Sequence, residues 1–342
     1  MANQAPDYRI TLDGRDLTPK LQARLMDLTL TETRGDEADQ LDLILSDHDG
    51  ALQIPRKGVT LTLSIGWAGA DLVDKGTFVV DEAEHSGAPD VITIRARSAE
   101  LGQALRTRAE HSYHATTLGT VLRQIAGRHK LKPRIDAGLA ARPVAHIDQT
   151  HESDINFLTR LAKLHDAVAT VKRATLIFLP ILGTTTSTGQ PLPSLTITRA
   201  SGDGHRFATS DREAYSGVRA YWHDPRRAKR RGVLVGKSGN AKKLRESSSS
   251  EAEARSAAVA AWRRLQRGLS TLELRLAIGQ PLLAPQTPVT VRGFKAEIDE
   301  IEWLASKVTH SIGNGGFTTQ VTLEMLDADP STGGVSSDAG VS

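Results

Sequence analysis

Long stretches of the chain alternate apolar with polar residues, the pattern of strands that bury one face. The clearest stretch spans residues 59–67, where Val59, Leu61, Leu63, Ile65 and Trp67 interleave with Thr60, Thr62, Ser64 and Gly66. The same period of two recurs at 26–31, 41–45, 271–277 and 317–325, and turn residues such as Asp13-Gly14, Ser86–Pro89 and Gly313–Gly316 separate such stretches. Short antiparallel strands at this spacing predict a barrel or a sandwich.

The period changes to that of helices in the middle of the chain. Apolar residues at helical spacing predict helices over 116–130 and 152–165, after a turn or two of helix over 99–105. A hairpin is expected from the strands 168–171 and 175–179. These residues predict a compact α/β insertion between two β-rich parts.

A third helix is expected over 251–267. Acidic Glu251 and Glu253 stand at its start, Arg263 and Arg264 near its end, and Gly268 stops it. Strand patterns follow over 271–277, 289–291, 303–311 and 317–325, interrupted by Pro281, Pro285 and Pro288.

Several ordered blocks of the chain carry a family resemblance. The blocks "EAEARSAAVAAWRRLQRG", "LELRLAIGQPLLAP", "IDEIEWLASKVTHSI" and "GGFTTQVTLEM", with "GTFVVDEAEHSG" and "QTHESDINFLTRLAKLHDAVATVK" upstream, resemble the phage late control gene D family. These are baseplate hub proteins of contractile tails, related to the hub portion of the type VI secretion spike protein VgrG. Asp166 stands where relatives often have glycine before a strand, and Glu300 stands near the position of a turn glycine.

The patterns and the resemblance together predict a mainly β fold with an α/β insertion. Two tube-like antiparallel β-barrel domains are expected to flank a small α/β domain. The expected divisions are 1–98 for the first barrel, 99–182 for the insertion and 183–326 for the second barrel. The second barrel is expected to include a basic loop (226–250) and the helix 251–267, and residues 327–342 are expected to be a flexible tail.

Composition narrows the classes of protein. The chain of 342 residues has no cysteine, which excludes disulfides and thiol chemistry. No stretch approaches the roughly 18 apolar residues of a membrane span, so synthesis in the host cytoplasm and no membrane insertion are expected. The 43 basic residues nearly balance the 40 acidic ones, and only 4% of residues are aromatic, which disfavours nucleic-acid binding.

Candidate chemistry in the sequence is sparse. Gly236-Lys237-Ser238 has only three residues between Gly232 and Gly236, whereas a phosphate-binding loop needs four, so a strand followed by a turn is favoured. The pairs His111 with His114 and His146 with His151 lack a third ligand at typical spacing and are better explained as surface or core residues. Trp303 and His310 are interpreted as packing residues. No catalytic residue, cofactor, metal or small-molecule substrate is predicted.

A basic run is the main candidate surface. It comprises Arg226, Arg227, Lys229, Arg230 and Arg231. It could meet nucleic-acid phosphates, but the resemblance favours a loop that becomes ordered against an acidic neighbouring subunit. Thr322 and Glu324 are expected to face outward from the last strand and to complete the candidate assembly surface.

The resemblance implies a structural role and no enzymatic activity. Relatives join a tube made of six-subunit rings to a trimeric central spike. A homotrimer with two barrels in each subunit would present six similar modules to the tube. The expected partners are therefore the tail tube protein, the central spike protein and other baseplate proteins, within a phage virion or a tail-like particle. The alternative is a nucleic-acid-binding or regulatory protein that uses the loop 226–245.

Overall fold

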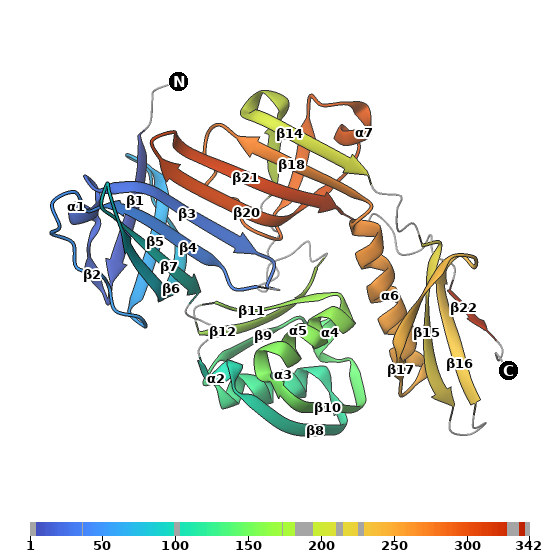
Figure 1. Cartoon of the computed structure of the whole chain (residues 1–342). Coiled ribbons are helices and arrows are strands. Elements are labelled where there is room, and N and C mark those ends of the chain that lie inside the picture. The colour runs from blue at the N-terminus through green and yellow to red at the C-terminus, as the bar shows by residue number, and fades with distance from the viewer. Residues whose placement is uncertain are drawn as a thin grey trace.

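A single large sheet joins the N-terminal strands of the chain to strands from residues 195–325 (Figure 1). This computed structural model describes residues 5–35, 37–98, 103–172, 174–181, 194–209, 215–224, 229–326 and 335–338. The main sheet has 13 strands, seven from the first 98 residues and six from residues 195–325. The fold is mainly β, as predicted from the alternating pattern.

The N-terminal half of the main sheet contains the strands that the alternation predicted. Its elements are β1 (Pro6–Leu12), β2 (Arg15–Asp16), α1 (Thr18–Leu21), β3 (Leu25–Thr33), β4 (Gln40–Ser46), β5 (Thr60–Trp67), β6 (Val73–Ser86) and β7 (Val91–Ser98). All these strands pair antiparallel in the order β3-β4-β7-β6-β5-β1-β2. The apolar residues at every second position of β5 are buried. They are Leu61, Leu63 and Ile65, and they share one core with Ile10 and Phe78.

The C-terminal half of the main sheet begins at residue 195. Its elements are β13 (Leu195–Thr198), a 3-10 turn (Arg199–Ser201), β14 (Gly202–Thr209), β18 (Ser270–Leu276), β19 (Pro288–Arg292), α7 (Ala296–Asp299), β20 (Trp303–Gly313) and β21 (Gly316–Met325). Trp303 is fully buried in a second core with Leu272, Val308 and Val321. Trp303 therefore packs as the sequence predicted.

The two halves meet where β3 pairs antiparallel with β20, from Lys307–Thr33 to Gly313–Asp27. The pairings of the described strands run from one end of the sheet to the other and do not close into a ring. The two tube-like β-barrel domains that the sequence predicted are therefore not closed among the described strands, which form two curved halves of one sheet. Alternation within a strand cannot distinguish these arrangements, because it does not specify which strand is the neighbour.

The middle module, residues 103–181, has a core of its own. Its elements are α2 (Gln103–Arg106), β8 (Arg108–Thr117), α3 (Leu118–Arg128), β9 (Lys132–Ile135), α4 (Ala137–Ala140), β10 (Pro143–Ser153), α5 (Asp154–His165), β11 (Ala167–Lys172) and β12 (Thr175–Pro180). Helices α3 and α5 confirm the two helical patterns. Thr117 and Ser153 accept backbone hydrogen bonds at the starts of these helices. Of the helix expected over 99–105, residues 99–102 lie outside the described residues.

The side module comprises residues 215–267 together with a short strand from the C-terminus. Its elements are β15 (Gly217–Asp224), β16 (Lys229–Gly236), β17 (Ala241–Ser248), α6 (Glu251–Arg267) and β22 (Val335–Asp338). Helix α6 covers the sheet with Ala254 and Ala258 against Val218 and Val233. The Ser250 hydroxyl accepts from the amide of Glu253, as expected of a helix that begins after the four serines.

Two expectations about this region are wrong. The basic segment 226–250 is not a loop where the structure describes it, because residues 229–236 and 241–248 are strands. The tail is not flexible throughout, because residues 335–338 pair with residues 232–235 of β16. The interval 183–193 that the sequence marked as a loop lies outside the described residues.

Asp166 and Glu300, which stand at or near positions where relatives often have glycine, differ in backbone conformation. Asp166 caps α5 in the left-handed conformation, φ 52° and ψ 51°, which glycine adopts without strain. Glu300 caps α7 with φ −78° and ψ −14°, which any residue adopts. Only the first position therefore has a geometry that favours glycine.

Candidate assembly surface

The basic run lies on the side module, away from the main sheet. Arg226 and Arg227 lie outside the described residues, whereas Lys229, Arg230 and Arg231 form the start of β16. The Arg230 guanidinium carbon lies 4.0 Å from the ring centre of Tyr221, and that of Arg231 lies 5.9 Å from the ring centre of Trp222. Arg231 also lies 3.9 Å from a carboxylate oxygen of Asp224. These contacts hold two of the charges against the neighbouring strand β15.

The last strand of the main sheet differs from its expected role. Val321 and Leu323 are fully buried, as the alternation predicted, and Met325 is half-buried. The Glu324 side chain is only 19% exposed and forms ion pairs with Arg34 and Arg267. Thr322 is half-buried, and its carbonyl accepts a hydrogen bond from the Ser306 hydroxyl. The prediction that Glu324 is available for a neighbour is therefore wrong, because its carboxylate is engaged within the chain.

A buried polar cluster pins the two halves of the main sheet together. Lys75 Nζ lies 2.7 Å from Glu32 Oε2, 3.1 Å from His310 Nε2 and 3.3 Å from the Leu283 carbonyl oxygen. His310 Nδ1 is 2.9 Å from the Thr319 hydroxyl. The side chains of Lys75, Glu32 and His310 are at most 5% exposed. Strands β3, β6 and β20 and the segment before β19 are thus joined at one point.

The charges of this polar cluster shift one another's pKa values. Burial raises the pKa of the Glu32 carboxyl, but the hydrogen bond from His310 and the charges of Lys75 and Lys172 outweigh burial and lower it to about 2. Burial lowers the pKa of Lys75 and that of His310. Glu32 therefore remains ionised in the folded protein at neutral pH.

The middle module is attached to both neighbours by charged contacts. Lys172 Nζ on β11 lies 3.2 Å from Asp39 Oδ2 and 3.9 Å from Glu32 Oε1, which links the middle module to the N-terminal half. Arg267 at the end of α6 donates two hydrogen bonds to Asp166, at 2.9 and 2.5 Å, and both side chains are at most 3% exposed. The left-handed Asp166 is thus fixed by a bidentate ion pair.

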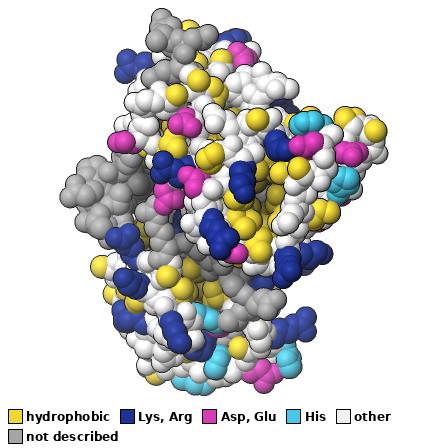
Figure 2. Space-filling model, turned by 90° about the vertical axis from the view of Figure 1, so that its left-hand side faces the viewer, with side chains coloured by type: hydrophobic (Ala, Val, Ile, Leu, Met, Phe, Trp, Pro, Cys, Tyr) yellow, Lys and Arg dark blue, Asp and Glu magenta, His cyan; other side chains and the backbone are white. Residues whose placement is uncertain are grey.

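Some apolar side chains remain on the surface. Leu282 is 79% exposed and Ile278 53% exposed, and both lie in the segment between β18 and β19. Ile54 and Met26, 53% and 41% exposed, belong to the N-terminal half. Figure 2 shows hydrophobic side chains gathered on one face with Lys and Arg side chains at their margin. Exposed apolar side chains with charged residues around them are typical of protein–protein interfaces.

The histidines that were weighed as metal candidates form other pairs in the structure. His114 and His146 face each other across β8 and β10, with 2.9 Å between their Nδ1 atoms, and His151 Nδ1 lies 3.1 Å from Glu110 Oε1. Within the described ranges, no group of three or more His, Asp or Glu side chains is arranged to hold a metal ion. Gly236 has φ 89° and ends β16, so Lys237 directly follows a strand and not a phosphate-binding loop. None of the described helices is long and apolar enough to cross a membrane.

Comparison with known proteins decides the family. A family model described as phage tail baseplate hub (GPD) matches residues 40–316. The chain belongs to this family. It is 43% identical over 366 aligned positions to the probable baseplate hub protein of Escherichia phage 186, covering 95% of this chain and 94% of the relative. The probable baseplate hub protein of Escherichia phage P2 is 42% identical over 364 positions, at the same coverage.

Solved structures show the same fold at low sequence identity. The 43 kDa tail protein of prophage MuSo2 from Shewanella oneidensis superposes with a TM-score of 0.70 at 16% identity, covering 96% of this chain and all of that one. A chain of the PdpA–VgrG complex of Francisella gives 0.56 at 8% identity, covering 95% of this chain and 58% of that one. The resemblance predicted from the sequence is confirmed. This baseplate hub chain is a structural component of a phage tail and not an enzyme.

Proposed function

We propose that this baseplate hub protein is a homotrimer that joins a six-subunit tail tube to a trimeric central spike. The observation that carries the proposal is the β3–β20 pairing, which makes two curved β halves of one chain into a single rigid sheet. Each half keeps its own buried core, so one subunit offers two comparable β modules. Three subunits then present six modules to the tube and three equivalent positions to the spike.

The unpaired sheet edges support assembly into a ring. Among the described strands, β14 pairs only with β18, and β1 pairs with β2 over only two of its residues. Neighbouring subunits that pair along such edges would satisfy their free backbone groups. The exposed Leu282 and Ile278 would add apolar contact area to the same assembly.

In this proposal the middle and side modules project from the ring and bind other baseplate proteins. Lys229 and Arg230 are exposed on β16 and face such partners. Glu324 instead stabilises the fold through its ion pair with Arg34. The protein is made in the host cytoplasm and assembled into the tail of a virion or a tail-like particle.

A sizing experiment tests the proposal. Light scattering after size exclusion of the chain with its cognate spike and tube proteins should reveal a complex that contains three hub chains. Three chains of 36.8 kDa contribute about 110 kDa to its mass. A hub chain that stays monomeric or dimeric at micromolar concentration and moderate salt, with both partners present, would overturn the proposal.

The alternative of nucleic-acid binding has little support in the geometry. Arg230 and Arg231 lie against Tyr221 and Trp222, so one face of each ring is already covered by a guanidinium group. A salt-sensitive gel shift with DNA that is lost on replacing Lys229 and Arg230 by glutamine would be the result favouring it.

A further inference from the structure

Helix α6 of the side module lies beside α5 of the middle module, and polar contacts join the two modules. Arg142 Nη1 donates to the Ser256 hydroxyl at 3.2 Å, Arg264 donates to the Lys163 carbonyl, and Arg267 binds Asp166. Between these contacts lie three adjoining cavities of about 590, 520 and 640 Å³. Together they form a cleft between α6 and the middle module, which we call the α6 cleft.

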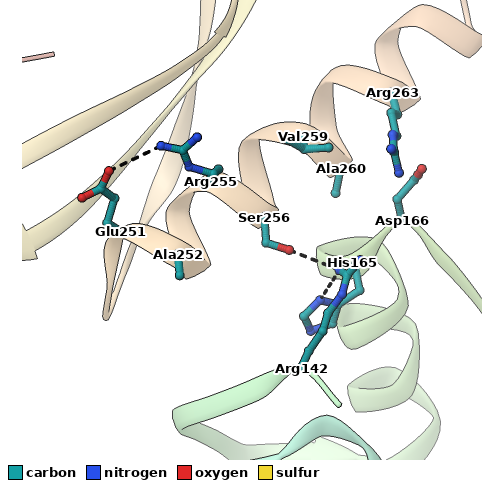
Figure 3. A pocket seen from close by; sticks show the side chains of 10 residues that line it. All are labelled: Arg142, His165, Asp166, Glu251, Ala252, Arg255, Ser256, Val259, Ala260 and Arg263. Carbon is teal, nitrogen blue, oxygen red and sulfur yellow. Dashed lines mark hydrogen bonds and ion pairs between the residues drawn. The ribbon is translucent and has the colours of Figure 1, made fainter. Parts of the chain in front are cut away.

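One end of the α6 cleft is cationic. Figure 3 shows Arg142 and His165 rising from the middle module toward Ser256, and Arg255 and Arg263 extending from α6. Burial first, and the charge of Arg142 second, lower the pKa of His165 to about 4, so His165 is neutral at neutral pH. The guanidinium groups of Arg142 and Arg263, one from each module, therefore lie at this end, whereas Arg255 is directed at Glu251.

The carboxylates near this end are already engaged. Glu251 lies 3.5 Å from Arg255, and Asp166 takes both of its hydrogen bonds from Arg267. Neither Arg142 nor Arg263 forms an ion pair with a carboxylate in the described part of the chain. The Nε of Arg263 is buried and has no hydrogen-bond partner there. Burial first, and then the charge of Arg263, lower the pKa of the Arg142 guanidinium, and the charges of Asp136 and Asp166 offset this only in part. The two neighbouring guanidinium groups therefore favour a further anion from outside the chain.

The floor of the α6 cleft is apolar and borders a strand edge. Val144, Ile147, Leu161 and Leu164 line its second cavity, which shares Arg142 and Ser256 with the cationic end. Consecutive residues 143–145 of β10 line this cavity, and β10 pairs only with β8 among the described strands. A free strand edge beside an apolar floor suits an extended polypeptide better than a small ion.

We propose that the α6 cleft binds an extended acidic segment of a partner polypeptide, with a carboxylate held by Arg142 and Arg263. The segment adds to the free edge of β10, places an apolar side chain near Val144 and Ile147, and directs the acidic one at the guanidinium groups. This goes beyond the proposed hub role, since binding at the α6 cleft needs neither a trimer nor a tube.

A fluorescein-labelled octapeptide of alternating aspartate and leucine, titrated into the full chain and followed by anisotropy, tests the inference. We expect the peptide to bind, and a matched peptide with asparagine in place of aspartate to bind about tenfold more weakly. Arg142→Gln and Arg263→Gln should each weaken binding of the acidic peptide about tenfold. Arg123→Gln, on the exposed face of α3 in the same middle module, should leave it within about twofold of wild type.

Several outcomes would overturn the inference. They are no binding by the wild type, equal binding of both peptides, and equal loss with the Arg123 variant. Preferential binding of a single-stranded oligonucleotide of equal charge, lost in the same two variants, would assign the α6 cleft to nucleic acid instead. If a charge variant is unfolded by circular dichroism, Ala252→Trp replaces it, because Ala252 is an exposed residue at the α6 cleft. Filling the α6 cleft should then abolish binding. The oligomeric state is measured on the same samples, so failure of this inference and failure of the hub proposal are read separately.

Discussion

At the scale of single residues, the joint between the halves of the main sheet depends on very close packing. Gly279 lies between two aromatic side chains: its carbonyl accepts from Trp67 Nε1 at 3.1 Å, and a Cβ on it would come within 2.3 Å of the Phe317 ring. Trp67 and Phe317 in turn have ring centres 5.2 Å apart. Trp67 from the N-terminal half and Phe317 from the C-terminal half therefore meet beside Gly279, at a position where only glycine fits.

Gly279→Ala tests this packing. We expect it to lower the free energy of unfolding by about 1–3 kcal/mol, because the buried Phe317 ring must move. Gly315→Ala is the matched control, since nothing lies within 4 Å of a Cβ there, and it should be neutral. Urea denaturation of both variants measures the difference, and equal midpoints would show that the Phe317 ring moves freely.

Glu32 gives the joint a predictable pH dependence. Its folded-state pKa of about 2 is below the ordinary value of 4.5, so its contribution to stability is present above pH 4.5. That contribution is lost as the pH falls from 4.5 toward 2. The stability difference between wild type and Glu32→Gln should therefore shrink over this interval, as measured by urea denaturation at several pH values. Glu82→Gln, which alters an exposed pair with Arg95, should give only a small difference; a constant difference for Glu32 would contradict the assignment.

At the scale of elements, α6 is packed through its smallest side chains. Ala254 and Ala258 are fully buried against Val218, Val233 and Val235. Small side chains at these two positions let the helix lie close to β15 and β16, and the larger Trp262 and Leu265 of α6 pack, partly buried, against the same core.

Enlarging one of these alanines should push the helix away from its sheet. Ala258→Leu is expected to cost about 1–3 kcal/mol of stability, because the added methyl groups have no space. Ala252→Leu, at an exposed position of the same helix, should be tolerated. Thermal unfolding followed by circular dichroism distinguishes them, and equal midpoints would mean that α6 adjusts freely.

The elements also show what the sequence could predict. Regular patterns were sufficient for β5, for the helices α3, α5 and α6, and for the hairpin of β20 and β21, because each pattern reflects one local buried face. Strand β16 was missed because its first residues are basic and show no apolar alternation. Arg230 and Arg231 are accommodated in a strand because their guanidinium groups lie over the rings of Tyr221 and Trp222 on β15. The cluster of Lys75, Glu32 and His310 was missed because its members are far apart in sequence and no local spacing links them.

At the scale of the whole molecule, the main sheet makes the strands of the first 98 residues and those of residues 195–325 one structural unit. Leu30 is fully buried on β3 and sits opposite His310 of β20 in the register. A packing defect at Leu30 should therefore destabilise both halves of the main sheet.

Leu30→Ala is expected to lower stability by about 2–5 kcal/mol. Hydrogen exchange should lose protection in both β4 and β21, because the strands between them share the β3–β20 joint. Val121→Ala, in the core of the middle module, should reduce protection mainly within residues 103–181. Loss confined to the N-terminal half in the Leu30 variant would mean that the halves unfold independently.

The chain leaves the main sheet after β14 and returns to it as β18, and these two strands are direct neighbours. Thr209 and Ser270 are partners in their antiparallel pairing, so the exit and the return lie side by side. Everything between them, including β15, β16, β17 and α6, is carried from one point at the margin of the scaffold. That point is a natural place for recombination: an engineer could substitute a foreign domain there and keep the main sheet, with loss of the β16–β22 pairing and of the Arg267–Asp166 ion pair.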